Sequence, residues 1–112
     1  IIVAATSSST PVVMGSWIAP GAHVVAMDAN RIQARELDDA AMSNVVVVDS
    51  REAVLKESGD VILSKAVIHG ELGEVLDGTK SIDPMQTTIF KSVGLAVEDI
   101  ASAKLVYDRT AR

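Results

Sequence analysis

Small hydroxyl residues follow two short apolar runs of the chain, at places where side chains could contact a ligand. A polar loop directly after a strand is one such place, and a strand–glycine–helix turn is another. Both are typical of an α/β domain built around a nucleotide. The residues concerned are Thr6, Ser7 and Ser8 after the first run, and Ser92 and Val93 before Gly94 after the last run.

The other ionisable residues do not form a catalytic or metal-binding pattern. Neither His23 nor His69 has a carboxylate or a second histidine at ligand spacing, so we expect structural roles for both. The chain has no cysteine, which excludes a disulfide framework, a zinc finger and a thiol nucleophile. We therefore predict no metal site. The acidic pairs are interpreted as a solvated helix face, Glu71 and Glu74, and as acids at a helix start, Glu98 and Asp99.

Length and composition predict a single α/β domain over residues 1–112. Hydrophobic residues make up 48% of the chain but aromatic residues only 3%, so Val, Ile, Leu and Ala must fill the core. Such a core is typical of parallel strands covered on both faces. The net charge of −5 argues against a nucleic-acid partner, and no apolar run is long enough to span a membrane. We expect a cytoplasmic protein.

Short apolar runs alternate with helical patterns along the whole chain. This alternation predicts a mainly parallel sheet of about four to five strands with right-handed crossovers. Strands are expected at residues 1–5, 23–28, 45–49 and 88–93, and a strand or a strand plus a loop at 60–68. Helices are expected at 36–44, 51–58, 70–78 and 95–109.

Four stretches, in family order, resemble the ornithine cyclodeaminase/μ-crystallin family. They are ATSSSTPVV (5–13), PGAHVVAMDANRIQARELD (20–38), GELGEVLDG (70–78) and FKSVGLAVEDIASAKLVY (90–107). The resemblance implies the second half of an NAD(P)-binding Rossmann domain, a partial three-layer fold. The glycine-rich first half and the substrate domain of the family have no counterpart, and no G-x-G-x-x-G occurs in the chain.

The resemblance also implies which residues lie near the cofactor. They are Thr6, Ser7, Ser8, Asn30, Ser92 and Val93. The alternative is structural, with hydroxyls that cap strand-end backbone groups, and for the isolated chain we favour it. Asn30 stands where the cyclodeaminases carry an Asp, and a carboxamide cannot act as a general base. Asp28, two residues earlier, could substitute only through a shifted loop. We therefore predict no catalytic residue.

Without the glycine turn, the isolated chain lacks the main contact to the pyrophosphate of a dinucleotide. We expect it to bind no cofactor, to be inactive alone and to act as a self-associating or interaction domain. A homodimer is expected through the open edge at strand 1–5. The alternative is a part of an NAD(P)-dependent amino-acid dehydrogenase or ornithine cyclodeaminase, with hydride transfer at the α-carbon and ammonia release. A third hypothesis is a small-ligand site at the carboxyl ends of the strands.

Overall fold

The computed structural model describes residues 1–110. Five strands and five α-helices alternate, with one 3-10 helix, η1, after the first strand. The strands are β1 (Ile2–Ala4), β2 (His23–Ala26), β3 (Val45–Val48), β4 (Ile68–Glu71) and β5 (Thr88–Lys91). The helices are η1 (Gly15–Trp17), α1 (Asp39–Met42), α2 (Arg51–Glu57), α3 (Gly59–Ser64), α4 (Leu72–Leu76) and α5 (Ala96–Thr110).

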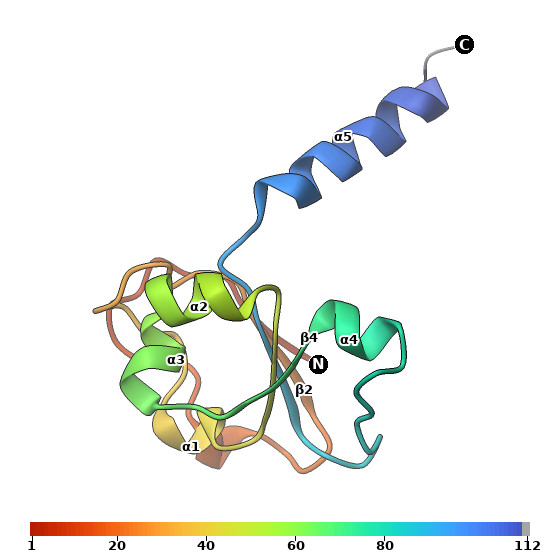
Figure 1. The fold of residues 1–112 in the computed structure, drawn as a ribbon. Helices are drawn as coiled ribbons and strands as arrows, with labels where there is room; N and C mark the ends of the chain where they lie inside the picture. Colours follow the sequence, from red (N-terminus) through yellow and green to blue (C-terminus); the bar gives the residue numbers. More distant parts are fainter. Residues whose placement is uncertain (111–112) are drawn as a thin grey trace.

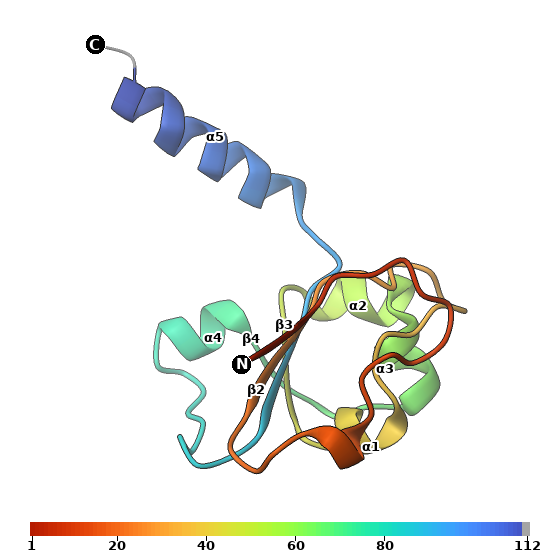
Figure 2. The same cartoon turned by 180° about the vertical axis from the view of Figure 1, so that it is seen from behind.

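The strands form one parallel sheet in the order β1-β2-β5-β3-β4, so the predicted α/β fold is confirmed. The last strand of the chain, β5, lies in the middle and pairs with both β2 and β3. Helices α1, α2 and α3 cover one face of the sheet, and α4 lies on the opposite side (Figures 1 and 2). The domain therefore has three layers, as the sequence predicts.

The core lies between the sheet and helices α1 to α3. Alternate strand residues such as Val24, Val46 and Ile89 point into it, because successive side chains of a strand face opposite sides. Leu37 and Met42 close it from the segment around α1. Small apolar side chains fill this space, as the shortage of aromatic residues requires.

The predicted strand at 60–68 is wrong. Residues 59–64 form α3, and the strand β4 begins only at Ile68. Ser58 caps α3 by accepting a hydrogen bond from the Val61 amide, and Lys65 ends the helix in the left-handed conformation at φ 55°. The apolar run suggested a strand, but the cap at Ser58 turns the same residues into a helix.

The interpretation of Glu71 and Glu74 as a free acidic face is also wrong. The Arg51 guanidinium lies 2.7 Å from the Glu74 carboxylate, and the Arg51 amide donates to Glu71. The two glutamates also form a capping box at the start of α4. The hydrogen bond from Arg51 is the main reason why the pKa of Glu74 is lowered from its usual value. The Arg51–Glu74 ion pair joins the start of α2 to α4.

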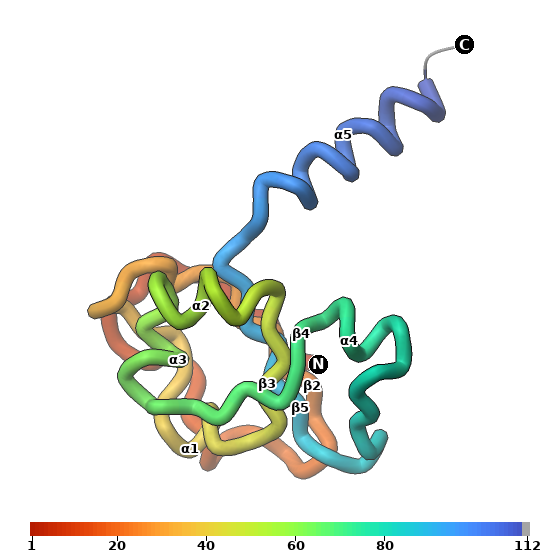
Figure 3. The backbone as a smooth tube through the Cα atoms, viewed as in Figure 1, coloured from red at the N-terminus to blue at the C-terminus, as the bar shows by residue number. Residues whose placement is uncertain are grey.

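Helix α5 extends away from the rest of the domain (Figures 1 and 3). None of its residues is buried. Its exposed apolar side chains are Val97, Ile100, Leu105, Val106 and Tyr107. As predicted, Glu98 and Asp99 lie in its first turn. None of the helices within residues 1–110 combines the length and the apolar character needed to cross a membrane.

Candidate functional site

The loops that follow β1, β2 and β5 meet at the carboxyl edge of the sheet, because neighbouring parallel strands end at the same edge. Backbone hydrogen bonds join them: the Met27 amide donates to the Ala4 carbonyl, and the Ser92 amide donates to the Ala26 carbonyl. Open parallel sheets bind their ligands at this edge. The structure therefore brings together the three segments on which the predicted cofactor residues lie.

A buried group of charged side chains, which we call the ionic cluster, lies beneath these loops. It consists of Glu36, Asp60 and Lys91, and all three side chains are 0% exposed. The Lys91 Nζ lies 3.2 Å from the Asp60 carboxylate and 3.9 Å from the Glu36 carboxylate. The same ammonium donates a hydrogen bond to the Asp28 carbonyl. Charges inside a protein require such partners, because burial removes their hydration.

Glu36 connects the loop after β1 to the loop after β2. One carboxylate oxygen accepts hydrogen bonds from the Thr6 amide and from the Thr6 hydroxyl, the latter at 2.8 Å. The other oxygen accepts from the Asp28 amide at 3.0 Å. Asp60 in turn accepts from the amides of Glu36 and Leu37 at 2.8 and 2.9 Å. The cluster thus fixes both ends of the segment 28–36.

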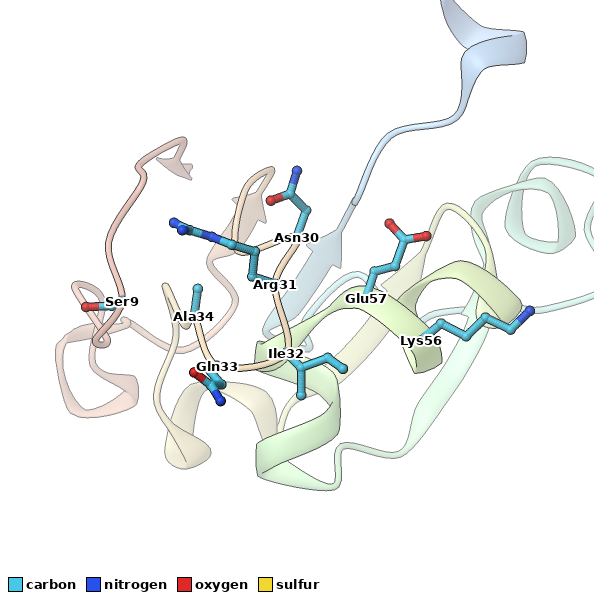
Figure 4. Close-up of a pocket in the computed structure, with 8 residues that line it drawn as sticks. All are labelled: Ser9, Asn30, Arg31, Ile32, Gln33, Ala34, Lys56 and Glu57. Atoms are coloured by element: carbon cyan, nitrogen blue, oxygen red, sulfur yellow. The ribbon is translucent and has the colours of Figure 1, made fainter.

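Asn30 lies in an open pocket of about 600 Å³ at this edge (Figure 4). Residues 30–34 form one side, and Ser9 and the end of α2 at Lys56 and Glu57 complete the lining. Asn30 and Arg31 are exposed to solvent. Ala29, just before them, is buried with a positive φ of 56°, which turns the chain outward toward the pocket.

The turn after β5 is held by the Asp49 side chain. One oxygen of this carboxylate accepts hydrogen bonds from the Ser92 hydroxyl at 2.8 Å and from the amides of Val93 and Gly94 at 2.9 Å each. Gly94 has a positive φ of 85°. Because the carboxylate already occupies these donors, the turn does not offer them to a phosphate. A second open pocket, of about 440 Å³, lies between this turn and Met27.

The predicted cofactor residues therefore fall into two groups. Ser7 and Asn30 are exposed at the carboxyl edge. The hydroxyls of the other three polar residues are engaged within the protein. Thr6 donates to Glu36, Ser8 donates to the Thr10 carbonyl, and Ser92 donates to Asp49. Asn30 and Ser92 line separate pockets, and Met27 lies beside Ser92 and Val93.

Sequence reasoning missed the acids that organise this edge, Glu36, Asp49 and Asp60, and the buried base Lys91. A signal for Lys91 is present, because it is two residues from Ile89 on β5 and must share the inward face of that strand. The acids carry no comparable pattern: Asp60 lies in the first turn of α3, and Asp49 directly follows β3. Charged residues are rarely buried, and so a solvated position is the default expectation.

The histidines lie outside the carboxyl-edge loops. The His23 ring lies 2.7 Å from the Thr88 hydroxyl, and the His69 ring lies 2.9 Å from the Ser81 carbonyl. Across residues 1–110, no group of three or more His, Asp or Glu side chains is placed to hold a metal ion.

The described residues fit the ribose and nicotinamide of a dinucleotide better than they fit its pyrophosphate. Exposed hydroxyl and amide groups at Ser7 and Asn30 could contact a ribose and a nicotinamide carboxamide. No glycine-rich turn opening a long helix follows β1 or β2, so the pyrophosphate has no comparable cradle in residues 1–110.

Comparison with known proteins gives consistent matches over the whole chain. The sequence model of the ornithine cyclodeaminase/mu-crystallin family matches residues 1–112. The ketimine reductase mu-crystallin of Macropus fuliginosus is 56% identical over 109 residues, which are 96% of this chain and 35% of the relative. The chain thus spans about 35% of the length of such curated relatives.

Two solved structures share the fold closely. The Thermococcus litoralis Δ1-pyrroline-2-carboxylate reductase, solved with NADH and L-proline, has a TM-score of 0.87 and 40% identity. It is matched over 97% of this chain and 37% of its own. An archaeal alanine dehydrogenase dimer with bound NAD has a TM-score of 0.82 and 36% identity, over 95% of this chain and 36% of its own.

Proposed function

Because the chain belongs to the ornithine cyclodeaminase/mu-crystallin family, we propose that it forms the nicotinamide-side half of an NAD(P)-binding domain. The whole protein would be a reductase or dehydrogenase acting on the C–N bond of an amino or imino acid. A bound NAD(P)H supplies the hydride for such a reaction. The names of the relatives, a ketimine reductase, a pyrroline-2-carboxylate reductase and an alanine dehydrogenase, support this reaction class.

The observation that carries the proposal is the arrangement of the carboxyl edge. Three loops meet there, and exposed Ser7 and Asn30 could hold the ribose and the nicotinamide in place. Asn30 has no ionisable oxygen, so it can orient a ligand by hydrogen bonds but cannot remove a proton. This favours a reductase or dehydrogenase over a cyclodeaminase. No pyrophosphate cradle is present in residues 1–110, and we propose that the isolated chain is inactive alone.

Titration with the two halves of NAD tests this proposal. We expect nicotinamide mononucleotide at millimolar concentration to shift the amide signals of Ser7 and Asn30 in NMR spectra of the isolated chain. AMP, the matched control, should leave them unchanged. Intact NADH should bind no tighter than about 1 mM, equivalent to roughly 4 kcal/mol. Tight NADH binding, or equal responses to AMP and to the nicotinamide half, would contradict the proposal.

A second proposal is self-association through the edge of β1, favoured by the exposure of this strand. Among the strands of residues 1–110, β1 pairs only with β2, and Ile1 and Val3 are 95% and 62% exposed. An unpaired strand edge readily accepts another strand. The structure of the archaeal relative is that of a dimer, which supports a dimeric assembly.

Mass measurement in dilute solution tests self-association. We expect a dimer for the chain and a monomer for Val3→Lys, because a charge on the edge strand opposes pairing. Met85→Lys changes a similarly exposed apolar residue in the loop before β5 and should leave the dimer intact. A monomeric parent chain, or equal effects of the two substitutions, would rule out this edge as the interface.

A further inference from the structure

We propose that Glu36 is a positioning residue, which holds the loop of Ser7 and the loop of Asn30 at fixed positions relative to each other. The inference rests in part on the proposed function, because the proposed function gives these two loops a shared ligand. Its structural basis is independent of that function. Within the described part of the chain, the single buried carboxylate of Glu36 accepts hydrogen bonds from these two loops alone.

Each carboxylate oxygen of Glu36 accepts hydrogen bonds from a different loop. Both donors of Thr6 go to Oε1, and the Asp28 amide goes to Oε2. Thr6 directly precedes Ser7, and Asp28 is two residues before Asn30. A rotation of this carboxylate would therefore move both exposed residues. The Glu36 carboxylate is held in place because the backbone amide of Glu36 donates to Asp60 and because Lys91 lies beside the carboxylate.

The charge arrangement suits this role. Glu36 and Asp60 carry two negative charges and Lys91 one positive charge, and all three are buried. Lys91 lies nearer to Asp60, at 3.2 Å, than to Glu36, at 3.9 Å. Glu36 therefore depends more on the donors of the two loops for its stabilisation, and these loops are ordered by the same hydrogen bonds.

Glu36→Gln separates positioning from a general contribution to stability. The substitution keeps the volume and leaves Lys91 paired with Asp60. We expect the single carbonyl oxygen of Gln to face Thr6, which offers two donors, so that its NH₂ group faces the Asp28 amide. Hydrogen exchange at the Asp28 amide should then become about tenfold faster, with the Thr6 amide still protected. The response of Ser7 and Asn30 signals to nicotinamide mononucleotide should also weaken.

Val54→Ala is the matched control. Val54 is fully buried in α2 and makes no hydrogen bond to either loop through its side chain. It should lower the melting temperature and raise exchange throughout the core, without a selective effect at Asp28. Unchanged exchange at Asp28 in Glu36→Gln, or the same exchange pattern in both variants, would overturn the positioning role.

Two further measurements keep the outcomes separate. If the parent chain does not respond to nicotinamide mononucleotide but Asp28 exchange changes selectively, positioning is supported and the proposed cofactor half is contradicted. If Glu36→Gln does not fold, Thr6→Val provides the second test, since it removes the hydroxyl that donates to Glu36 and accepts from the Ser8 amide. The Ser8 amide loses its acceptor directly in this variant, so its exchange does not count. Faster exchange at the amides of residues 6, 7 and 28, without a change in the rest of the core, supports positioning, and unchanged exchange at these three amides overturns it.

Discussion

We expect Lys91→Met to lower the free energy of unfolding by about 3–5 kcal/mol, because it removes one partner of a buried ion group. The substitution leaves two buried carboxylates, Glu36 and Asp60, without the ammonium group that lies beside them. It also leaves the Asp28 carbonyl without its side-chain donor. Urea denaturation followed by circular dichroism measures the loss. If the free energy of unfolding falls by less than about 1 kcal/mol, the two buried carboxylates do not need the positive charge of Lys91.

Two variants test the cause of this loss. Lys104→Met changes an exposed lysine whose partner, Asp108, lies one helical turn away on α5, and should cost no more than about 0.5 kcal/mol. The triple variant Glu36→Gln/Asp60→Asn/Lys91→Met removes every charge of the cluster. It should recover much of the lost stability, because no uncompensated charge then remains buried.

We expect Gly59→Ala to be the second strongly destabilising substitution, at about 3 kcal/mol, because there is no room for a side chain. A Cβ at residue 59 would lie 2.0 Å from the Ala34 carbonyl oxygen and 2.8 and 2.9 Å from those of Arg31 and Ile32. These are backbone atoms, so relief requires the loop that lines the pocket to move. Thermal and urea unfolding would measure the loss.

Gly73→Ala is the matched control, and its expected effect has the opposite sign. Gly73 lies in α4, and no atom lies within 4 Å of the place its Cβ would take. Alanine in a helix restricts the unfolded chain more than glycine does, so stability should rise by about 0.5–1 kcal/mol. Equal and small effects at both positions would show that the loop of residues 31–34 yields easily.

Most elements of the fold could be predicted from local patterns. The four consecutive valines of β3 predict a buried strand, and the serine before α2 marks a helix start. The apolar start of the chain correctly predicts the strand β1 but not its burial, because Val3 is exposed at the edge of the sheet. The run at 60–68 shows the limit of this reasoning. Its apolar residues fit either period, and the helix is decided by Ser58 and by the burial of Asp60 against Glu36 and Leu37.

The strand order and the ionic cluster could not be predicted in the same way. The position of β5 between β2 and β3 depends on contacts between segments more than 40 residues apart. The roles of Glu36, Asp60 and Lys91 depend on the same long-range packing. The resemblance to a family predicted which loops carry the candidate cofactor residues, but not the side chains that hold those loops together.

The central place of β5 also constrains how the protein can be made. β2 and β3 do not pair with each other, and so the two pairs of outer strands share no partner until residues 88–91 arrive. While only the chain as far as α4 has left the ribosome, the strand pairs β1-β2 and β3-β4 are not yet joined, and isolated two-stranded units are marginal in water. The five-stranded sheet can therefore form only after β5 has been synthesised. Until then, the exposed apolar strands are potential clients for chaperones.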